Sequence, residues 1–320
     1  MKVNLRIYPG YANEQEIIVF GHVFKRDYLG DKLFDSGRFK NARAVIKLFM
    51  MKTLGNINVQ FTFRNTTVST TSLKDGYFRF SIPYSEDLDC GWHKFEVTAS
   101  IEGKSTSAEG EFVKPYPGEF GMISDIDDTF LVSHSNNIFK KLYVMLSRNV
   151  EKRKVFDGVV EHYRQLNKAG RNDKSESNAF FYVSSSEWNL FSLIDQFTRL
   201  NNFPKAVFKL QKIKLGWFDL LFSGGGNHEH KFHKIKHIME FYPDLKFVLM
   251  GDDSQQDPYI FEQVAKIFPQ NIFAVYVRQT KSKKKSEVEK VMNNISSLAD
   301  TCYFYQSAEA MEHSKKIGLV

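Results

Sequence analysis

The sequence FGMISDIDDTF, residues 120–130, decides how the second half of this chain is interpreted. A largely apolar run, Phe120–Ser124, leads directly into the aspartates Asp125, Asp127 and Asp128. An uninterrupted apolar run is typical of a strand that is buried on both faces. Two carboxylates at positions i and i+2 beyond its end can converge on one phosphate, so that one attacks phosphorus and the other protonates the leaving oxygen. A plain acidic turn after a strand is the competing interpretation.

Apolar strands alternate with helices after this motif. A parallel sheet that is covered by helices on both faces has this pattern, because neither face of its strands meets water. The sequence therefore predicts an α/β domain with a doubly wound parallel sheet, whose site lies at the carboxyl ends of the strands. The predicted strands are 120–124, 180–183, 246–250 and 272–277, and the predicted helices are 159–168, 187–200, 230–242 and 258–268.

The first third of the chain is predicted to be mostly β-structure. Apolar and polar residues alternate in several short stretches, which is the period of a half-buried strand. The pair Asp75-Gly76 directly precedes one of these stretches and is a strong turn signal. Short strands separated by turn residues favour a small antiparallel β-sandwich, with one helical interruption at 42–51.

A domain junction is predicted where these two patterns meet. The segment KPYPGEFG, residues 114–121, contains two prolines and two glycines. Proline fixes φ and glycine supplies unusual backbone angles, so this composition is typical of a linker or a sharp turn between domains. We therefore expect a β-sandwich-like accessory domain at 1–116 and the α/β domain at 117–320.

The composition is that of an ordinary globular protein, with 42% hydrophobic and 25% charged residues. A formal net charge of +7 favours anionic partners, such as nucleic acid, acidic lipid surfaces or phosphorylated metabolites. The two cysteines, Cys90 and Cys302, lie far apart, which argues against a disulfide framework or a zinc site. No apolar stretch is long enough for a signal peptide or a transmembrane helix. We therefore expect a soluble, cytoplasmic protein.

Three further polar motifs lie at strand ends or at the start of a helix. Ser184 and Ser185 follow an apolar strand, where hydroxyl and backbone N–H groups can hold a phosphate oxygen. Lys231 lies near the start of a predicted helix and could neutralise a phosphate. Asp252 and Asp257 follow the next apolar strand and are natural carboxylate ligands of a metal or supports for such ligands.

Each of these motifs has an ordinary alternative when it is taken alone. Serines cap helices, most helix lysines are solvated, and an acidic stretch after a strand can be a calcium loop or a turn. His233 and His237 stand four residues apart, as zinc-binding histidines can, but the HExxH order is missing. The aspartate pair, the serine, the lysine and the acidic pair nevertheless occur in one order beside strand ends, so the combination is more specific than any single motif.

This order and character resemble the four motifs of haloacid-dehalogenase-like (HAD) phosphatases. The resemblance implies a HAD-like fold in which Asp125 is the nucleophile and Asp127 is the general acid and base. It also implies Mg²⁺ held by Asp125, the backbone carbonyl of Asp127 and Asp252. The position of Asp257 after the same strand adds it as a further candidate metal carboxylate. Lys231 would offset negative charge during catalysis. The residues expected to bind the phosphate or support its loop are Ser184, Ser185 and Thr129.

A narrower resemblance covers about residues 118–280. Five segments are similar to the catalytic domain of the actin-patch phosphatidate phosphatase family, which removes phosphate from phosphatidate to leave diacylglycerol. Glu187 and the stretch 253–256 differ from the residues that are usual in that family, although no catalytic atom is lost. The segments are FGMISDIDDTFL, FFYVSSSEWNLF, NNFPKAVFKL, EHKFHKI and FVLMGDDSQQDPYIF.

The expected function is therefore hydrolysis of a phosphomonoester, with phosphatidate as the first candidate substrate. The same chemistry on a soluble or nucleic-acid phosphate and a non-catalytic binding module are the alternatives. No nucleic-acid motif supports a nucleic-acid partner. Segment 138–156 is basic and helically amphipathic, and 215–222 is apolar, so peripheral membrane contact and core packing are both open for them. The oligomeric state is not predicted.

Overall fold

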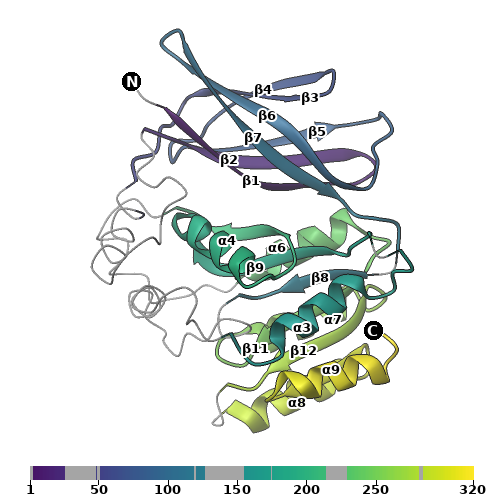
Figure 1. The fold of residues 1–320 in the computed structure, drawn as a ribbon. Helices are drawn as coiled ribbons and strands as arrows, with labels where there is room; N and C mark the ends of the chain where they lie inside the picture. The colour runs from purple at the N-terminus through teal and green to yellow at the C-terminus, as the bar shows by residue number, and fades with distance from the viewer. Residues whose placement is uncertain are drawn as a thin grey trace. The chain divides into compact units, whose positions relative to one another are not determined.

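The computed structural model describes residues 3–25, 48, 51–118, 120–126, 155–173, 175–213, 229–280 and 284–320. The chain forms two compact units, and the main break between them falls between Pro115 and Tyr116, one residue from the predicted junction. The segment Glu187–Leu193 and the described part of Lys212–Gly225 group with the first unit. That the two units are separate domains stays a prediction. Figure 1 labels most of their helices and strands.

Several predicted features lie outside the described residues. Two of them are candidate site residues, Asp127 and Thr129. The same holds for almost all of the predicted helices at 42–51 and 138–156, and for the whole apolar segment 215–222. Among the helices that the structure describes, none is long and apolar enough to cross a membrane.

The first unit is built on one seven-stranded sheet, in the order β4 (Thr66–Thr71), β3 (Asn58–Phe63), β6 (Gly91–Ile101), β7 (Lys104–Lys114), β1 (Asn4–Ala12), β2 (Glu16–Phe24) and β5 (Tyr77–Pro83). The neighbouring strands are antiparallel except for β1 and β7, which run parallel. The edge strands β4 and β5 contact each other. The sheet therefore curls around one core, whereas the predicted sandwich would have two separate sheets.

Alternating side chains build the core of this unit. β5 buries every second residue, as its alternating sequence predicts. Phe80 from β5 packs on Phe61 from β3, with ring centroids 5.8 Å apart. The predicted turn lies just before β5, where Gly76 has a φ of 79°. The Asp75 carboxylate accepts a hydrogen bond from the N–H of Tyr77 at 3.1 Å, which stabilises that turn.

The second unit contains a six-stranded sheet, in the order β10 (Ala206–Gln211), β9 (Ala179–Glu187), β8 (Phe120–Ser124), β11 (Lys246–Asp252), β12 (Ile272–Arg278) and β13 (Asp300–Phe304). β8 pairs in parallel with both β9 and β11, and parallel pairing continues through β12 to β13. The prediction of a parallel α/β sheet is confirmed. The carboxyl ends of β8 and β11 therefore meet at one edge of the sheet.

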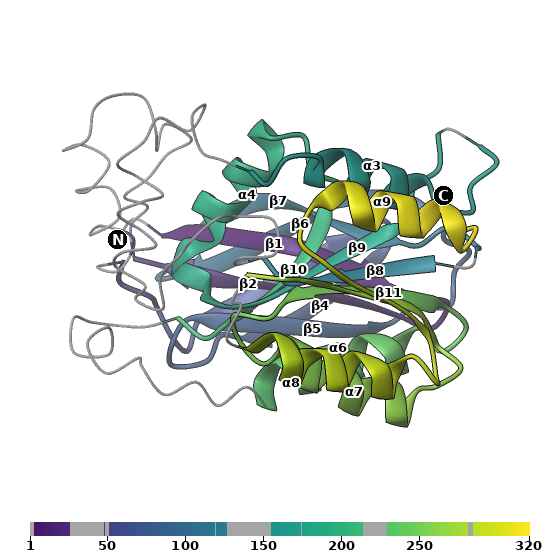
Figure 2. The ribbon, with the colours of Figure 1, turned by 90° about the horizontal axis from the view of Figure 1, so that it is seen from below.

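Helices cover both faces of this sheet, as Figure 2 shows. α3 (Val159–Lys168), α4 (Phe191–Leu200) and α9 (Ser307–Lys316) lie on one face. α6 (Glu229–Phe241), α7 (Asp257–Ile267) and α8 (Lys285–Ile295) lie on the other. All five residues of β8 are buried between these layers, as is every residue of β11 after its first. This burial on both faces is the reason why the sequence has continuous apolar runs at these strands.

The strand and helix limits differ from the prediction at one important place. β9 continues through Ser184 and Ser185 to Glu187, although its apolar run ends at Val183. The Ser184 hydroxyl accepts the N–H of Ser186 at 2.9 Å, a local bond that offsets the burial of polar groups in this strand. The sequence interpretation also left out β10, β13, α8 and α9. β13 fully buries one residue in five, so it lacks a strong apolar pattern.

A buried polar network joins α3, α9 and β12. The His162 Nε2 atom lies 2.8 Å from Ser314 Oγ, which in turn lies 2.7 Å from the Tyr276 hydroxyl. Burial lowers the pKa of His162 to about 4, and the positive charge of Arg278 acts in the same direction. The folded protein therefore holds this imidazole in its neutral form at neutral pH.

Acid should destabilise the second unit through His162. Its pKa is 6.5 in the unfolded chain and about 4 in the folded protein, so the unfolded state binds more protons between these values. The contribution of the neutral imidazole is complete above pH 6.5. It should fall by up to about 3 kcal/mol as the pH drops to about 4, which urea unfolding at a series of pH values would measure.

The matched variants are His162→Gln and His233→Gln, the second at an exposed position on α6. The free energy of unfolding of His162→Gln should depend less on pH between about 6.5 and 4, because glutamine does not titrate. His233→Gln should keep the pH dependence of the unaltered protein. An identical pH dependence in all three proteins would show that His162 is not the responsible group.

Candidate active site

Asp125 is fixed at the end of β8, inside the sheet. Its N–H donates to the carbonyl oxygen of Met250 on β11 at 2.8 Å, which extends the strand pairing by one residue. The hydroxyl of Ser124 donates to the carbonyl oxygen of Asp125 at 2.6 Å and lies 2.6 Å from the Tyr163 hydroxyl of α3. The backbone of Asp125 is thus held from both sides, and its side chain is buried.

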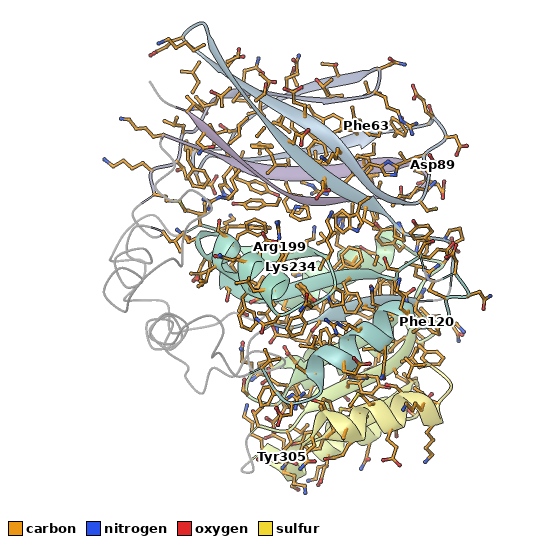
Figure 3. The ribbon with its side chains drawn as sticks, viewed as in Figure 1. Phe63, Asp89, Phe120, Arg199, Lys234 and Tyr305 are labelled. Carbon is orange, nitrogen blue, oxygen red and sulfur yellow. The ribbon has the colours of Figure 1, made fainter. Side chains whose placement is uncertain are left out.

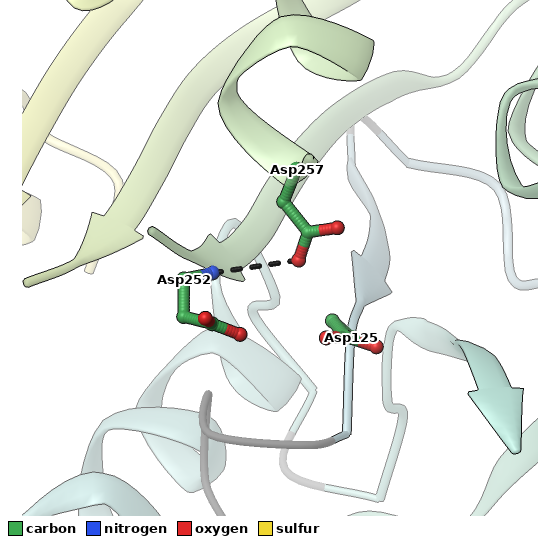
Figure 4. Close-up of side chains that lie close together, drawn as sticks. All are labelled: Asp125, Asp252 and Asp257. Atoms are coloured by element: carbon green, nitrogen blue, oxygen red, sulfur yellow. Dashed lines mark hydrogen bonds between the residues drawn. The ribbon is translucent and has the colours of Figure 1, made fainter. Parts of the chain in front are cut away.

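Asp252 and Asp257 reach the same place from the neighbouring strand and helix (Figure 4). Asp252 ends β11, and Asp257 opens α7, where an acidic residue is favoured by the helix dipole. The backbone N–H of Asp252 donates to Asp257 Oδ2 at 3.4 Å. Gly251 makes this approach possible, because a Cβ atom there would lie 2.6 Å from Asp257 Oδ2. The N–H of Ser254 orients the Asp252 carboxylate at 2.5 Å.

Lys231 places a positive charge among these carboxylates. Its Nζ atom lies 3.1 Å from Asp125 Oδ1 and forms a second ion pair with Asp257 Oδ1. The side chain is 2% exposed. Burial by itself lowers the pKa of Lys231, but the carboxylates of Asp125 and Asp257 outweigh it and raise the pKa above its ordinary value. Lys231 is therefore charged in the folded protein.

The charge of this group is not balanced. One oxygen from each of Asp125, Asp252 and Asp257 lies within 4.8 Å of the others, and all three residues are buried. When all three carboxylates are ionised, they carry three negative charges against the one positive charge of Lys231. Burial, and then the neighbouring Asp257 carboxylate, raises the pKa of Asp252. Buried carboxylate oxygens with a surplus of negative charge form a donor set that fits a hard divalent cation.

The structure thus brings together four of the predicted site residues, Asp125, Lys231, Asp252 and Asp257. Ser184 and Ser185 lie near the carboxyl end of the neighbouring strand β9. The Ser184 carbonyl oxygen accepts a hydrogen bond from Lys234 at 3.4 Å. The Ser185 hydroxyl is buried and has no hydrogen-bond partner within the described part of the chain.

Sequence reasoning missed two kinds of residue at this site. The first kind supports the loops. Asp253 accepts hydrogen bonds from the N–H of Thr280 at 2.7 Å and from the Tyr303 hydroxyl at 2.8 Å. It therefore connects the segment after β11 both to the segment after β12 and to the strand β13. No local pattern distinguishes such a carboxylate from its neighbour Asp252. The second is Lys234, whose spacing of three residues from Lys231 on one helix was a readable signal.

Comparison with known proteins agrees with this geometry. Residues 120–279 match the family described as phosphatidate phosphatase APP1, catalytic domain. The match covers half of the 320-residue chain and includes all four of the converging residues. The chain belongs to this family. The family assignment confirms the resemblance that the five sequence segments indicate.

Two curated relatives extend the match beyond this span. Phosphatidate phosphatase APP1 of Saccharomyces cerevisiae is 28% identical over 248 residues, which are 74% of this chain and 40% of that protein. An uncharacterized protein of Schizosaccharomyces pombe is 24% identical over 221 residues, which are 65% of this chain and 34% of that protein. The chain thus spans well under half the length of either relative.

A solved structure adds nothing to this assignment. A carbohydrate acetylesterase of Xanthomonas citri aligns with 99% of this chain and 74% of its own, at 8% sequence identity. Its TM-score is 0.34, which is too low to indicate a shared fold. The family assignment therefore depends on the sequence match to the catalytic domain.

Lys231→Met should destabilise the second unit, because it leaves Asp125 and Asp257 buried without the ammonium that both contact. Removing one partner of a buried ion pair is expected to lower the free energy of unfolding by about 3–5 kcal/mol. Added Mg²⁺ should restore part of the loss, because a bound cation compensates the same carboxylates. Urea unfolding with and without Mg²⁺ measures both effects.

Lys236→Met is the matched control on the same helix. The Nζ atom of Lys236 lies 3.6 Å from Glu240 Oε1, and the two side chains are 40% and 53% exposed. Loss of such a surface pair should change the free energy of unfolding by less than about 1 kcal/mol, with or without Mg²⁺. Equal losses in the two variants would contradict the account of Lys231 as the counterion of the site.

Proposed function

We propose that this chain is a Mg²⁺-dependent phosphatase that hydrolyses phosphatidate through an aspartyl-phosphate on Asp125. The observation that carries the proposal is the convergence of Asp125, Asp252, Asp257 and Lys231 at the carboxyl end of β8. These side chains come from four separate elements, so no local feature of the sequence brings them together. Family membership supports a phosphatase reaction at this place.

We assign the second unit a HAD-like fold on the order of its strands. The chain runs from β8 outward to β10, returns past β8 to β11, and then continues outward to β13. The order in which successive strands are added therefore reverses between β8 and β11. Ligands of doubly wound sheets bind at such a switch point. Asp125 follows the first of these two strands and Asp252 ends the second.

In the first step of the proposed reaction, a carboxylate oxygen of Asp125 attacks phosphorus while the bond from phosphorus to the leaving oxygen breaks. The leaving oxygen takes a proton, for which Asp127, outside the described residues, is the proposed donor. Lys231 holds the attacking carboxylate in place and offsets the negative charge that develops around phosphorus. The products of this step are diacylglycerol and the phosphorylated Asp125.

In the second step, water attacks phosphorus and gives its proton to Asp127, and the bond between phosphorus and Asp125 breaks to release inorganic phosphate. The carboxylates of Asp125, Asp252 and Asp257 and the backbone carbonyl of Asp127 are the proposed ligands of Mg²⁺. When bound, the ion would supply positive charge for the transferring phosphoryl group.

Phosphatidate is proposed as the substrate because the family description and the Saccharomyces cerevisiae relative both refer to it. Such a substrate lies in a membrane, so the proposal includes peripheral contact between a cytoplasmic enzyme and a lipid surface. The net charge of +7 would favour an anionic surface. Soluble phosphomonoesters offer the same reacting bond, and the test therefore includes one.

Phosphate release should be measured from phosphatidate vesicles and from a soluble phosphomonoester, with and without Mg²⁺. We expect release that requires Mg²⁺ and is faster on the vesicles. Asp125→Asn should lower turnover by roughly a thousandfold or more while the protein stays folded, because the substitution removes the nucleophile and little volume. Near-normal turnover by Asp125→Asn would refute the covalent mechanism.

Asp127→Asn should slow both halves of the reaction. A general acid and base typically contributes about 10²–10⁴-fold, so formation and hydrolysis of the phosphorylated enzyme should each slow by about that factor. Rapid-quench measurement of the phosphorylated protein separates the two steps. If only one of them slowed, Asp127 would not be both the acid and the base.

A further inference from the structure

Lys234 is a basic side chain beside the site that the proposed reaction does not use (labelled in Figure 3). It lies three residues after Lys231 on α6, so the two side chains share one face of the helix. Its Nζ atom donates to the carbonyl oxygen of Ser184 at 3.4 Å, near the carboxyl end of β9. Lys234 is half-buried, whereas most lysines on a helix surface are solvated.

No carboxylate within the described residues forms an ion pair with Lys234. This distinguishes it from the neighbouring lysines of α6, since Lys231 pairs with Asp125 and Asp257, and Lys236 pairs with Glu240. A carbonyl oxygen is a neutral acceptor and compensates the ammonium charge less than a carboxylate does. Lys234 is therefore a half-buried amine whose protonated form suits an anionic ligand.

The charges of the site call for such a cation. Lys231 already contacts two carboxylates, and the three aspartates, when all are ionised, exceed its charge by two. A bound divalent cation would offset that excess and leave little positive charge for a phosphomonoester, which carries up to two negative charges. A further cation close to Lys231 would balance the incoming phosphate.

We propose that Lys234 is a substrate-binding residue. Its ammonium group donates to a phosphate oxygen of a phosphomonoester dianion, either in place of the Ser184 carbonyl oxygen or in addition to it. This inference rests on the proposed function and deepens it, because it assigns a recognition contact for the doubly charged phosphate. The free phosphate ion and a lipid phosphate share this chemistry. Lys234 binds the phosphate, and the aspartates and Lys231 carry out the reaction.

The surroundings of Lys234 favour proton uptake when an anion arrives. Burial, and then the charge of Lys231 on the same helix, lowers the pKa of Lys234 to about 7. The charge of Asp125, which follows β8, has a weaker effect in the opposite direction. The Ser184 carbonyl oxygen from β9, which accepts the hydrogen bond of Lys234, carries no charge. Above pH 7 an approaching phosphate would stabilise the protonated amine. Phosphate affinity should therefore weaken with rising pH in a way that depends on this lysine.

The test measures the affinity for inorganic phosphate by calorimetry in the presence of Mg²⁺, and KM and kcat on phosphatidate vesicles and on a soluble phosphomonoester. The variants are Lys234→Met and Lys234→Arg, with Lys236→Met, which removes a lysine paired with Glu240, as the control on the same helix. Mg²⁺ affinity without phosphate is measured for each variant. It should stay within about threefold of the unaltered protein, since Lys234 forms no ion pair with Asp125, Asp252 or Asp257, the proposed metal ligands that the structure describes.

Lys234→Met should weaken phosphate binding and raise KM on both substrates by about 10–100-fold, the usual effect of losing a hydrogen bond to a charged group. Its kcat should fall less than its KM rises. Lys234→Arg should retain most of the affinity and lose the decline of affinity above pH 7, because arginine stays protonated. Lys236→Met should match the unaltered protein in every measurement.

The outcomes separate this inference from the proposed function. Unchanged phosphate affinity and KM in Lys234→Met would overturn the inference and leave the phosphatase assignment intact. Weakened phosphate binding in Lys234→Met, in a protein that releases no phosphate from either substrate, would support the inference and overturn the proposed function. A loss confined to kcat, or an equal loss of Mg²⁺ affinity, would show that Lys234 does not bind the substrate.

Discussion

Three buried carboxylates of like charge share one small region of this protein, and Lys231 holds two of them directly. Without a counterion their mutual repulsion and their burial would both oppose folding. One lysine reduces this cost without removing it, which leaves the site poised for a further cation. Burial, and then the neighbouring charge of Asp257, raises the pKa of Asp252 in this region. Both the stability and the chemistry proposed for this unit therefore depend on how the surplus charge is compensated.

The architecture of the second unit is what makes this concentration of charge possible. β8 and β11 are neighbours in the sheet, so the aspartates at their ends meet although they are distant in the sequence. α6 and α7 cover the same face (Figure 2). They bring Lys231 and Asp257 to that edge, where Lys231 contacts Asp125. Small details then fix the distances. Gly251 leaves room for the carboxylate of Asp257, and Ser124 with Tyr163 fixes the backbone of Asp125.

A phosphomonoester would bring further negative charge into this region, and the two lysines of α6 have different parts in its compensation. Lys231 is fully buried and paired, so its charge is already engaged. Lys234, one helical turn away, donates to a neutral carbonyl oxygen and has a pKa near 7. A cation in those surroundings gains stability when an anion binds. The proposed division of work, with Lys231 for the reaction and Lys234 for recognition, follows from this difference in surroundings.

The sequence by itself determined the parallel sheet, because burial on both faces requires continuous apolar runs. It also determined where the aspartates lie, because they stand where two of these runs end. It also determined the family, through the segments around those ends. It did not show the extension of β9 through its serines, the edge strand β13, the anchoring role of Asp253 or the surroundings of Lys234. Each of these depends on contacts between segments far apart in the chain, such as Asp253 with Tyr303 and Lys234 with Ser184. Only the tertiary structure decided them, because burial and charge compensation are properties of the assembled neighbours of a residue.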